Sequence, residues 1–462
     1  MPGNFDNHDD FDAESGNESS SGAGGGAGGG GKFDPAEFQK FLQQFIDNPQ
    51  NFDAAELAKA AGLSNDPEQI ALMLKQLQAA MGASGAVESG VNWDLALQNA
   101  KQTAAAQSKP ISLAQREGLR EALGIAQLWL DGATAISGLA TEPKLLTREL
   151  WVEDAMPLFR ALSEPVANRM SGALSEHMQQ NAPEELSQIM ASAGQLMKSA
   201  GGALFGMQLG QAVGRMSSQA LSGGDIGLPI FAEQRAAFLP QNIGEFLVDL
   251  GVDQREALIY LSVRELAHAR LFKHSKWLRE HVVAQINAYA HDISIDDSKL
   301  IELAETEALS NPEELRGVLE SGALIADRTP EQQRALESIE TLLALIEGWV
   351  EAVTQQATQL LPKSAAIAEA VRRRRAVGGP AEQTFGTLVG LELRPRRLRE
   401  ATAMWRLVGE QLGADARDAL WDHPDLVPTA ADIDAPQQLV ARLSGNQDGD
   451  DMDKALRDLL GQ

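Results

Sequence analysis

The 462-residue sequence contains no cysteine. Thiol nucleophiles, disulfide bonds and cysteine-ligated zinc are therefore excluded, and any bound metal would have to use His, Asp, Glu or water as ligands. Aromatic residues make up only 5% of the chain, whereas Ala, Leu, Gln and Glu recur throughout. This composition predicts a mainly helical protein with little strand, long enough for two or three domains.

Positive charge is also scarce. The chain has 39 Lys and Arg residues against 65 Asp and Glu, a formal charge of −26, which argues against nucleic acid as a partner because phosphates would be repelled. No apolar run reaches the roughly 18 residues that a bilayer span needs, and the first residues lack the basic and apolar regions of a secretory signal. We therefore expect a cytoplasmic protein with no membrane partner.

The chain divides by composition into four parts. Residues 1–31 form an acidic and glycine-rich tail that we expect to be disordered. Residues 32–82 predict a small helical module, residues 90–436 one long helical domain, and residues 437–462 an acidic C-terminal tail. The best candidate for a short strand is "DIGLPIFA", residues 225–232, whose proline predicts an edge position.

One predicted helix carries glycine at every fourth position, at Gly202, Gly206, Gly210 and Gly214. A glycine inside a helix costs about 1 kcal/mol relative to alanine, so four on one face indicate that another backbone approaches closely. In a membrane this pattern would indicate a dimerisation face, but polar residues such as Gln208 interrupt the segment. We therefore predict tight packing within a soluble core.

The segment "GVDQREALIYLSVRELAHARLF" predicts a buried helix over residues 254–273. Asp253 and Glu256 match the capping box that begins a helix. Apolar residues then occupy nearly every face, which is typical of a helix with no exposed side. Any charged side chain in the middle of this helix must be paired or bound to a metal.

Arg264, Glu265 and His268 in this helix differ by one letter from the His-Glu-x-x-His motif of zinc peptidases. Residues 264 and 268 lie one turn apart, and Glu265 stands where the motif places the general base that activates water. His274 stands where the longer motif has its third ligand, although Leu271 replaces the glycine of that motif. Arginine offers no lone pair to a metal, so spacing alone favours a buried Arg–Glu pair with a hydrogen-bonded histidine.

Several longer segments of the sequence resemble those of a known family. "WLDGATAISG", "RELAHARLFKHSKWLREHV", "LIEGWVEAVTQQA", "AVRRRRAVGGPAEQTFGTLVGLELRPRRLREATAMWRLV" and "RDALWDHPDLVPTAADIDAP" are similar to the signatures of bacterial zincin-like hydrolases, a family labelled zinc-dependent metalloproteases. The resemblance covers residues 90–436 and implies a mostly helical zincin-like fold with metallohydrolase activity. It also implies that Glu265 is catalytic and that His268 is the second zinc ligand, while Arg264 departs from the first ligand.

Two hypotheses follow. In the first, the protein is a zinc metallopeptidase that cleaves a peptide or protein substrate and binds zinc through His268, His274 and one further residue. The further ligand would be an acidic residue or a histidine later in the chain, and the candidate histidines are His281, His291 and His423. In the second, the protein is a catalytically inactive zincin-fold scaffold or binding protein, in which Arg264 supplies the positive charge of the metal and pairs with Glu265 or another carboxylate.

A second cluster of charge stands out near the C-terminus. Eight arginines fall between residues 372 and 399, and four of them are consecutive, namely Arg372, Arg373, Arg374 and Arg375. One interpretation is an anion-binding surface for carboxylates, phosphates or an acidic protein segment. The other, which we favour, is that these arginines pair with the acidic majority of the same domain.

Overall fold

The computed structural model describes residues 90–180, 187–228, 230–231, 235–248, 250–294, 326–378, 380–390 and 395–445, together with Asp296 and Ser298. These residues all belong to one compact unit, Leu77–Gln462. The predicted tail at residues 1–31 and the predicted module at residues 32–82 lie outside the described residues. Towards the C-terminus the chain stays helical to residue 445 and buries Leu439 and Val440, so the fold continues past the predicted boundary at residue 436.

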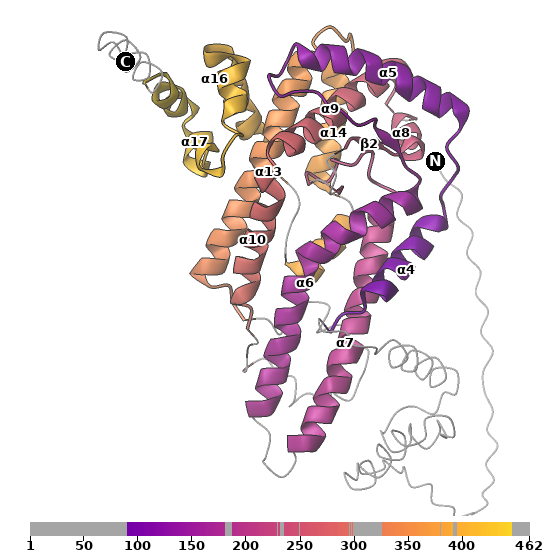
Figure 1. The fold of residues 1–462 in the computed structure, drawn as a ribbon, viewed down its shortest axis with the longest axis vertical. Coiled ribbons are helices and arrows are strands. Elements are labelled where there is room, and N and C mark those ends of the chain that lie inside the picture. The colour runs from indigo at the N-terminus through magenta and orange to yellow at the C-terminus, as the bar shows by residue number, and fades with distance from the viewer. Residues whose placement is uncertain are drawn as a thin grey trace, which may run out of the picture. The chain divides into compact units, whose positions relative to one another are not determined.

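The described residues are mainly helical, as predicted (Figure 1). The longer helices are α4 (Trp93–Ala105), α5 (Leu113–Asp131), α6 (Arg148–Gln180), α7 (Ser187–Met216), α8 (Pro240–Leu247), α9 (Gln254–His274), α10 (Trp277–His291), α13 (Pro330–Ala357), α14 (Ser364–Val377), α15 (Pro380–Val389) and α16 (Leu398–Ala419). Two short helices follow, η3 (Pro424–Leu426) and α17 (Ala430–Asp434). None of the described helices has both the length and the apolar character that a bilayer span requires.

Helix α9 confirms the buried helix that the sequence predicts. Asp253 caps its first turn by accepting the backbone N–H groups of Arg255 and Glu256, and every residue from Ala257 to Phe272 is buried. The predicted capping box is incomplete, because the Glu256 side chain accepts the backbone N–H of Lys363 instead of returning to the cap. The helix therefore begins where expected and is tied at its first turn to a distant segment.

Helix α13 packs against α9. Its start is strongly specified: Thr329 and Gln332 form a complete capping box, and Pro330 occupies the first turn. Its second half is buried on all sides around Trp349, where Glu347 and Glu351 are the buried carboxylates. A helix of this kind places ionisable groups where only other protein groups can neutralise them.

The glycines of α7 pack against α4, which confirms the predicted tight contact. A Cβ atom added at Gly206 would lie 2.9 Å from the carbonyl oxygen of Asn92, and one at Gly214 would lie 2.7 Å from that of Ala100. Helices α4, α6 and α7 form one group of helices, in which α4 contacts both α6 and α7 and the long helices α6 and α7 lie side by side (Figure 1). Glycine is needed on this face because any side chain would push the two backbones apart.

We expect Gly210→Ala to lower the free energy of unfolding by about 1–3 kcal/mol, because its Cβ would overlap the carbonyl oxygen of Ala96 in α4. The matched control is Gly201→Ala in the same helix, where an added Cβ meets nothing within 4 Å. That substitution should stabilise by up to about 1 kcal/mol, the gain in helix propensity. Equilibrium urea unfolding measures both, and equal effects would show that the α4–α7 contact does not require glycine.

Two short strands pair in parallel, β1 (Lys144–Leu145) and β2 (Ala237–Phe238), and Lys144 lies opposite Ala237. The prediction of a strand at residues 225–232 is wrong for the described part of that segment, which forms turns and bends. We call residues 221–228, 230–231 and 235–236 the covering loop. This loop runs back to β2 across the buried middle of α9, and the backbone N–H of Gly224 donates to Glu265 of that helix.

Candidate functional site

The centre of the candidate site is a single carboxylate, that of Glu347 in α13. Arg264 of α9 forms an ion pair with its Oε2 atom, and Nε2 of His268 lies 3.1 Å from its Oε1 atom. All three side chains are buried, and Glu347 is fully so. Two residues one turn apart on α9 thus converge on one point, as the spacing predicts, but they bind a carboxylate there.

The charges in this cluster follow from its geometry. Burial by itself would raise the pKa of Glu347, but the nearby Arg264, His268 and Arg375 outweigh it and hold the pKa far below its usual range. Burial opposes the charged form of Arg264 as well, yet Glu347 and Glu351 raise its pKa further. For His268, burial prevails over the attraction of Glu347 and lowers the pKa. At neutral pH the cluster is therefore an ion pair with a neutral imidazole.

The tautomer of His268 follows from its partner. Ionised Glu347 can only accept hydrogen bonds, so a neutral His268 must carry its proton on Nε2 and donate it to Oε1. The lone pair of the ring is then on Nδ1. The ring nitrogen that faces Glu347 consequently has no lone pair to offer to a metal.

Two arginines of α14 complete the cluster around α13. Nη1 of Arg372 lies 2.6 Å from Oε1 of Glu351, and Nη1 of Arg264 lies 3.6 Å from the other oxygen of the same carboxylate. Nη2 of Arg375 lies 3.7 Å from Oε1 of Glu347. The two buried carboxylates of α13 are thus each shared between Arg264 and one arginine of the predicted arginine run.

The other two arginines of the run bind carboxylates other than Glu347 and Glu351. Arg373 is exposed and lies 3.9 Å from Glu369 of the same helix. Arg374 forms an ion pair with buried Asp225 of the covering loop and donates to the carbonyl oxygen of Gln219 at 3.2 Å. Each member of the predicted anion-binding set therefore has a carboxylate partner within the domain, with which an external anion would have to compete.

Glu265 points away from this cluster and into the covering loop. Its two oxygens accept the backbone N–H groups of Gly224 and Ala237, both at 2.9 Å. Burial raises the pKa of Glu265 to about 7, although these hydrogen bonds favour the ionised form. The pairing of Arg264 with Glu265 that the second hypothesis allowed is thus not formed, and the other carboxylate is Glu347.

Glu265 and His268 line a common space, but it is small. The cavity between α9 and the covering loop measures about 10 Å³, enough for about one water molecule. The covering loop closes directly over the imidazole, because a Cβ atom on Gly224 would lie 2.7 Å from Cβ of His268. A peptide substrate cannot approach Glu265 unless this loop moves.

His274 is not brought to the site. It ends α9, where its Nε2 atom lies 2.6 Å from Oδ1 of Asp422. His274 follows His268 by six residues in the same helix, and this separation places the two rings on different sides of α9.

The three remaining candidate ligands also lie elsewhere. His281 packs edge-to-face against Trp277, with ring centroids 5.8 Å apart. His291 and His423 are exposed and pair with aspartates one and two residues along the chain. Within the described ranges, no three His, Asp or Glu side chains gather closely enough to hold a metal ion.

The donors present do not fit zinc. A catalytic zinc site needs three ligands with lone pairs and an open position. Among the residues that the structure describes, only His268 and Glu347 are suitably placed, and they are bonded to each other. The guanidinium groups of Arg264 and Arg375 occupy the surroundings of the carboxylate. A dication would have to displace a permanent positive charge from a buried site.

Sequence reasoning missed Glu347. The phrase "LIEGWVEAV" carries the signal, because Glu347 and Glu351 lie four residues apart within a run that is otherwise apolar. A carboxylate inside such a helix requires a buried cation, and α9 supplied one in Arg264. What the pattern does not contain is the information that these two helices face each other.

The described residues form a mainly helical domain in which Glu265 and His268 stand on one buried helix, α9, packed against α13. Residues 91–440 match the zincin-like metallopeptidase family, and the chain therefore belongs to that family. A presumed hydrolase with a novel fold from Chloroflexus aurantiacus is similar over 77% of this chain and 99% of its own, with a TM-score of 0.53 and 18% identity, which shows a shared fold. None of the curated proteins matches this chain.

Proposed function

We propose that this protein is a non-hydrolytic member of its family, a binding or scaffold protein in which Arg264 supplies the positive charge of the metal. The observation that carries the proposal is the buried ion pair between Arg264 and Glu347, with His268 donating to the same carboxylate. The guanidinium neutralises Glu347 permanently, because it stays protonated at every relevant pH. A zinc ion would be repelled from this place by a charge only a few Å away.

The position of Glu265 supports the same conclusion. A general base must reach the water that it activates, usually within about 3.2 Å. Both oxygens of Glu265 are instead bonded to backbone amides of Gly224 and Ala237, and the adjoining cavity has room for little more than one water molecule. The residue acts as an anchor that holds the covering loop on α9.

The second candidate function is a zinc-dependent peptidase. It is favoured by the pKa of Glu265, which burial raises to about 7 and which would suit a general base at neutral pH. For this function the ion pair of Arg264 would have to open and the covering loop would have to move away. Its substrate would be a peptide or a protein.

Metal analysis of the wild-type protein separates the two functions. We expect tag-free full-length protein, exposed to zinc and then dialysed, to retain far less than one zinc per chain when measured by inductively coupled plasma mass spectrometry. The protein should also leave a mixed peptide library uncleaved, with and without added zinc. One zinc per chain, together with cleavage that a chelator abolishes, would overturn the proposal and establish the peptidase.

A further inference from the structure

Four residues of the covering loop, 224–227, lie between two points that the fold fixes in place. On one side, the backbone N–H of Gly223 donates to the carbonyl oxygen of Ala237 in β2 at 3.0 Å. On the other side, Leu228 is only 2% exposed and belongs to the hydrophobic core. The segment between them has the sequence Gly-Asp-Ile-Gly, and glycine at both ends gives it backbone freedom there. We call residues 224–227 the tip.

The ends of the tip cover the charged cluster with backbone and not with side chains. A Cβ atom added at Gly224 would lie 3.0 Å from Nδ1 of His268, and one at Gly227 would lie 3.1 Å from Oε1 of Glu347. Gly227 also has a φ of +79°, a conformation that favours glycine. Because neither glycine inserts a side chain into the cluster, the tip can lift from it without withdrawing one.

The tip lies over the nitrogen of His268 that carries the lone pair. Nε2 of this histidine donates to Glu347, so the lone pair is on Nδ1, and Gly224 approaches Nδ1 directly. The whole residue is only 1% exposed. We therefore expect a solute to reach this nitrogen only when the tip moves.

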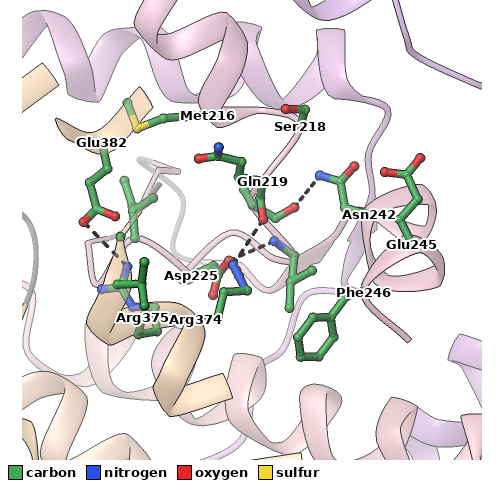
Figure 2. Close-up of a pocket in the computed structure, with 15 residues that line it drawn as sticks. Met216, Ser218, Gln219, Asp225, Asn242, Glu245, Phe246, Arg374, Arg375 and Glu382 are labelled. Carbon is green, nitrogen blue, oxygen red and sulfur yellow. Dashed lines mark hydrogen bonds and ion pairs between the residues drawn. The ribbon is translucent and has the colours of Figure 1, made fainter. Parts of the chain in front are cut away.

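The loop also borders unfilled space. A pocket of about 380 Å³ lies between the loop and the helices α7, α8, α14 and α15 (Figure 2). Leu221, Asp225 and Ile226 of the loop line this pocket, whereas Gly223 and Gly224 line the small cavity beside Glu265 and His268. The loop thus separates the buried cluster from a space into which the tip could move.

An ion pair ties the tip to α14. Arg374 pairs with Oδ2 of Asp225, and both residues line the pocket (Figure 2). Burial by itself would raise the pKa of Asp225, but the positive charges of Arg374 and Arg375 outweigh it and lower the pKa, so the carboxylate is ionised at neutral pH. The side chain of Asp225 is 7% exposed. A buried charge of this kind holds the tip at its partner, because leaving the partner would leave the charge uncompensated.

We propose that the tip is a lid over His268 and Glu347, and that the ion pair between Asp225 and Arg374 is the latch that keeps the lid shut. When the latch opens, the tip swings about its two glycines, and Nδ1 of His268 becomes accessible while α9 and α13 stay packed. The lid controls access to the cluster in either candidate function, so this inference does not rest on the proposed function.

Chemical labelling of His268 tests the latch. Diethyl pyrocarbonate modifies a histidine nitrogen that carries a lone pair, and peptide mass spectrometry measures its rate at each histidine of the full chain. In the wild type we expect His268 to react far more slowly than His291, whose side chain is 85% exposed. Arg374→Met should raise the rate at His268 at least about ten-fold, because the lid loses its latch, and leave the rate at His291 unchanged.

Arg373→Met is the matched control, since the side chain of Arg373 is 76% exposed and lies near Glu369 of its own helix. The rate at His268 in this variant should equal that of the wild type. If Arg374→Met and Arg373→Met give the same rate at His268, the ion pair of Arg374 is not a latch and the proposal is overturned.

Hydrogen exchange distinguishes an open lid from a loosened protein. In Arg374→Met, the peptide that spans residues 221–228 should exchange at least about ten-fold faster, while peptides from the buried middle of α9 should exchange as in the wild type. A parallel rise in α9 would show that His268 is exposed by unfolding of the core, which contradicts the lid. Asp225→Asn removes the same ion pair, keeps an oxygen that can accept the N–H of Leu221, and should give the same results if Arg374→Met does not fold.

Discussion

Replacing Glu347 with glutamine should lower the free energy of unfolding by about 3–5 kcal/mol, the usual cost of removing one partner from a buried ion pair. Glutamine keeps the size of the side chain but removes the charge that Arg264 and Arg375 face. It also presents an NH₂ group to neighbours that are themselves donors, so at least one buried donor is left unpaired. Equilibrium urea unfolding with the linear extrapolation measures the change.

The control lies on the same helix. Glu340 is paired with Arg396 at 3.5 Å, but its side chain is 32% exposed, so water can replace the partner. Glu340→Gln should cost less than about 1 kcal/mol. If Glu347→Gln costs no more than Glu340→Gln, the buried cluster does not hold α9 and α13 together in the way described.

A second variant, Arg264→Met, tests whether Arg264 and Glu347 interact directly with each other. Arg264→Met alone should be strongly destabilising, because it leaves Glu347 with one cation fewer in a buried site. Combined with Glu347→Gln, it should cost less than the sum of the two single changes, by about 1–3 kcal/mol, as expected for residues in direct contact. Additive effects would show that the two side chains do not interact.

Replacing Arg264 with histidine should create a zinc site, whereas we expect the wild-type protein to retain no zinc. The imidazole of residue 264 would stand one turn from His268, and both would face the carboxylate of Glu347, which already lies within hydrogen-bonding distance of His268. Three ligands of this kind, with a position left for water, form the arrangement of catalytic zinc. The substitution also removes a fixed positive charge from the place that the dication would take.

Arg264→Gln is the matched control, since it removes the same charge without adding an imidazole. We expect one zinc per chain in the histidine variant after dialysis, and none in the glutamine variant or the wild type. Cobalt(II) provides a second readout, because a tetrahedral site gives visible absorption. Circular dichroism must first show that both variants fold, and a folded histidine variant that retains no zinc would show that residue 264, His268 and Glu347 do not converge.

The sequence predicted the part of the site that is local. Asp253 marks the start of α9, the apolar residues on every face predict its burial, and the helical period places residues 264 and 268 on one side. Each of these properties depends on residues a few positions apart, and each is confirmed. The predicted return of Glu256 to its own cap was wrong because a distant backbone amide, that of Lys363, binds it instead.

The partners of the site could not be predicted, because they come from distant parts of the chain. Glu347 lies 83 residues from Arg264, and nothing near either residue specifies that α9 and α13 face each other. The partners of Glu265 are backbone amides, at Gly224 and Ala237, which every residue except proline possesses. A pattern of side chains carries no information about which amides a loop will present.

The α4–α7 contact has a consequence for how the two helices find their alignment. A groove with glycine at every fourth position looks the same after a shift of four residues, a slide of about 6 Å along the helix axis. The groove alone therefore sets how closely the two helices approach, but it does not set their register along the helix axis. The register must be fixed by residues at the ends of the helices. Gly214 is the last glycine of the series because α7 ends at Met216, and Thr103 of α4 rests against it. The contact between the last turns of α4 and α7 thus fixes the register of the two helices.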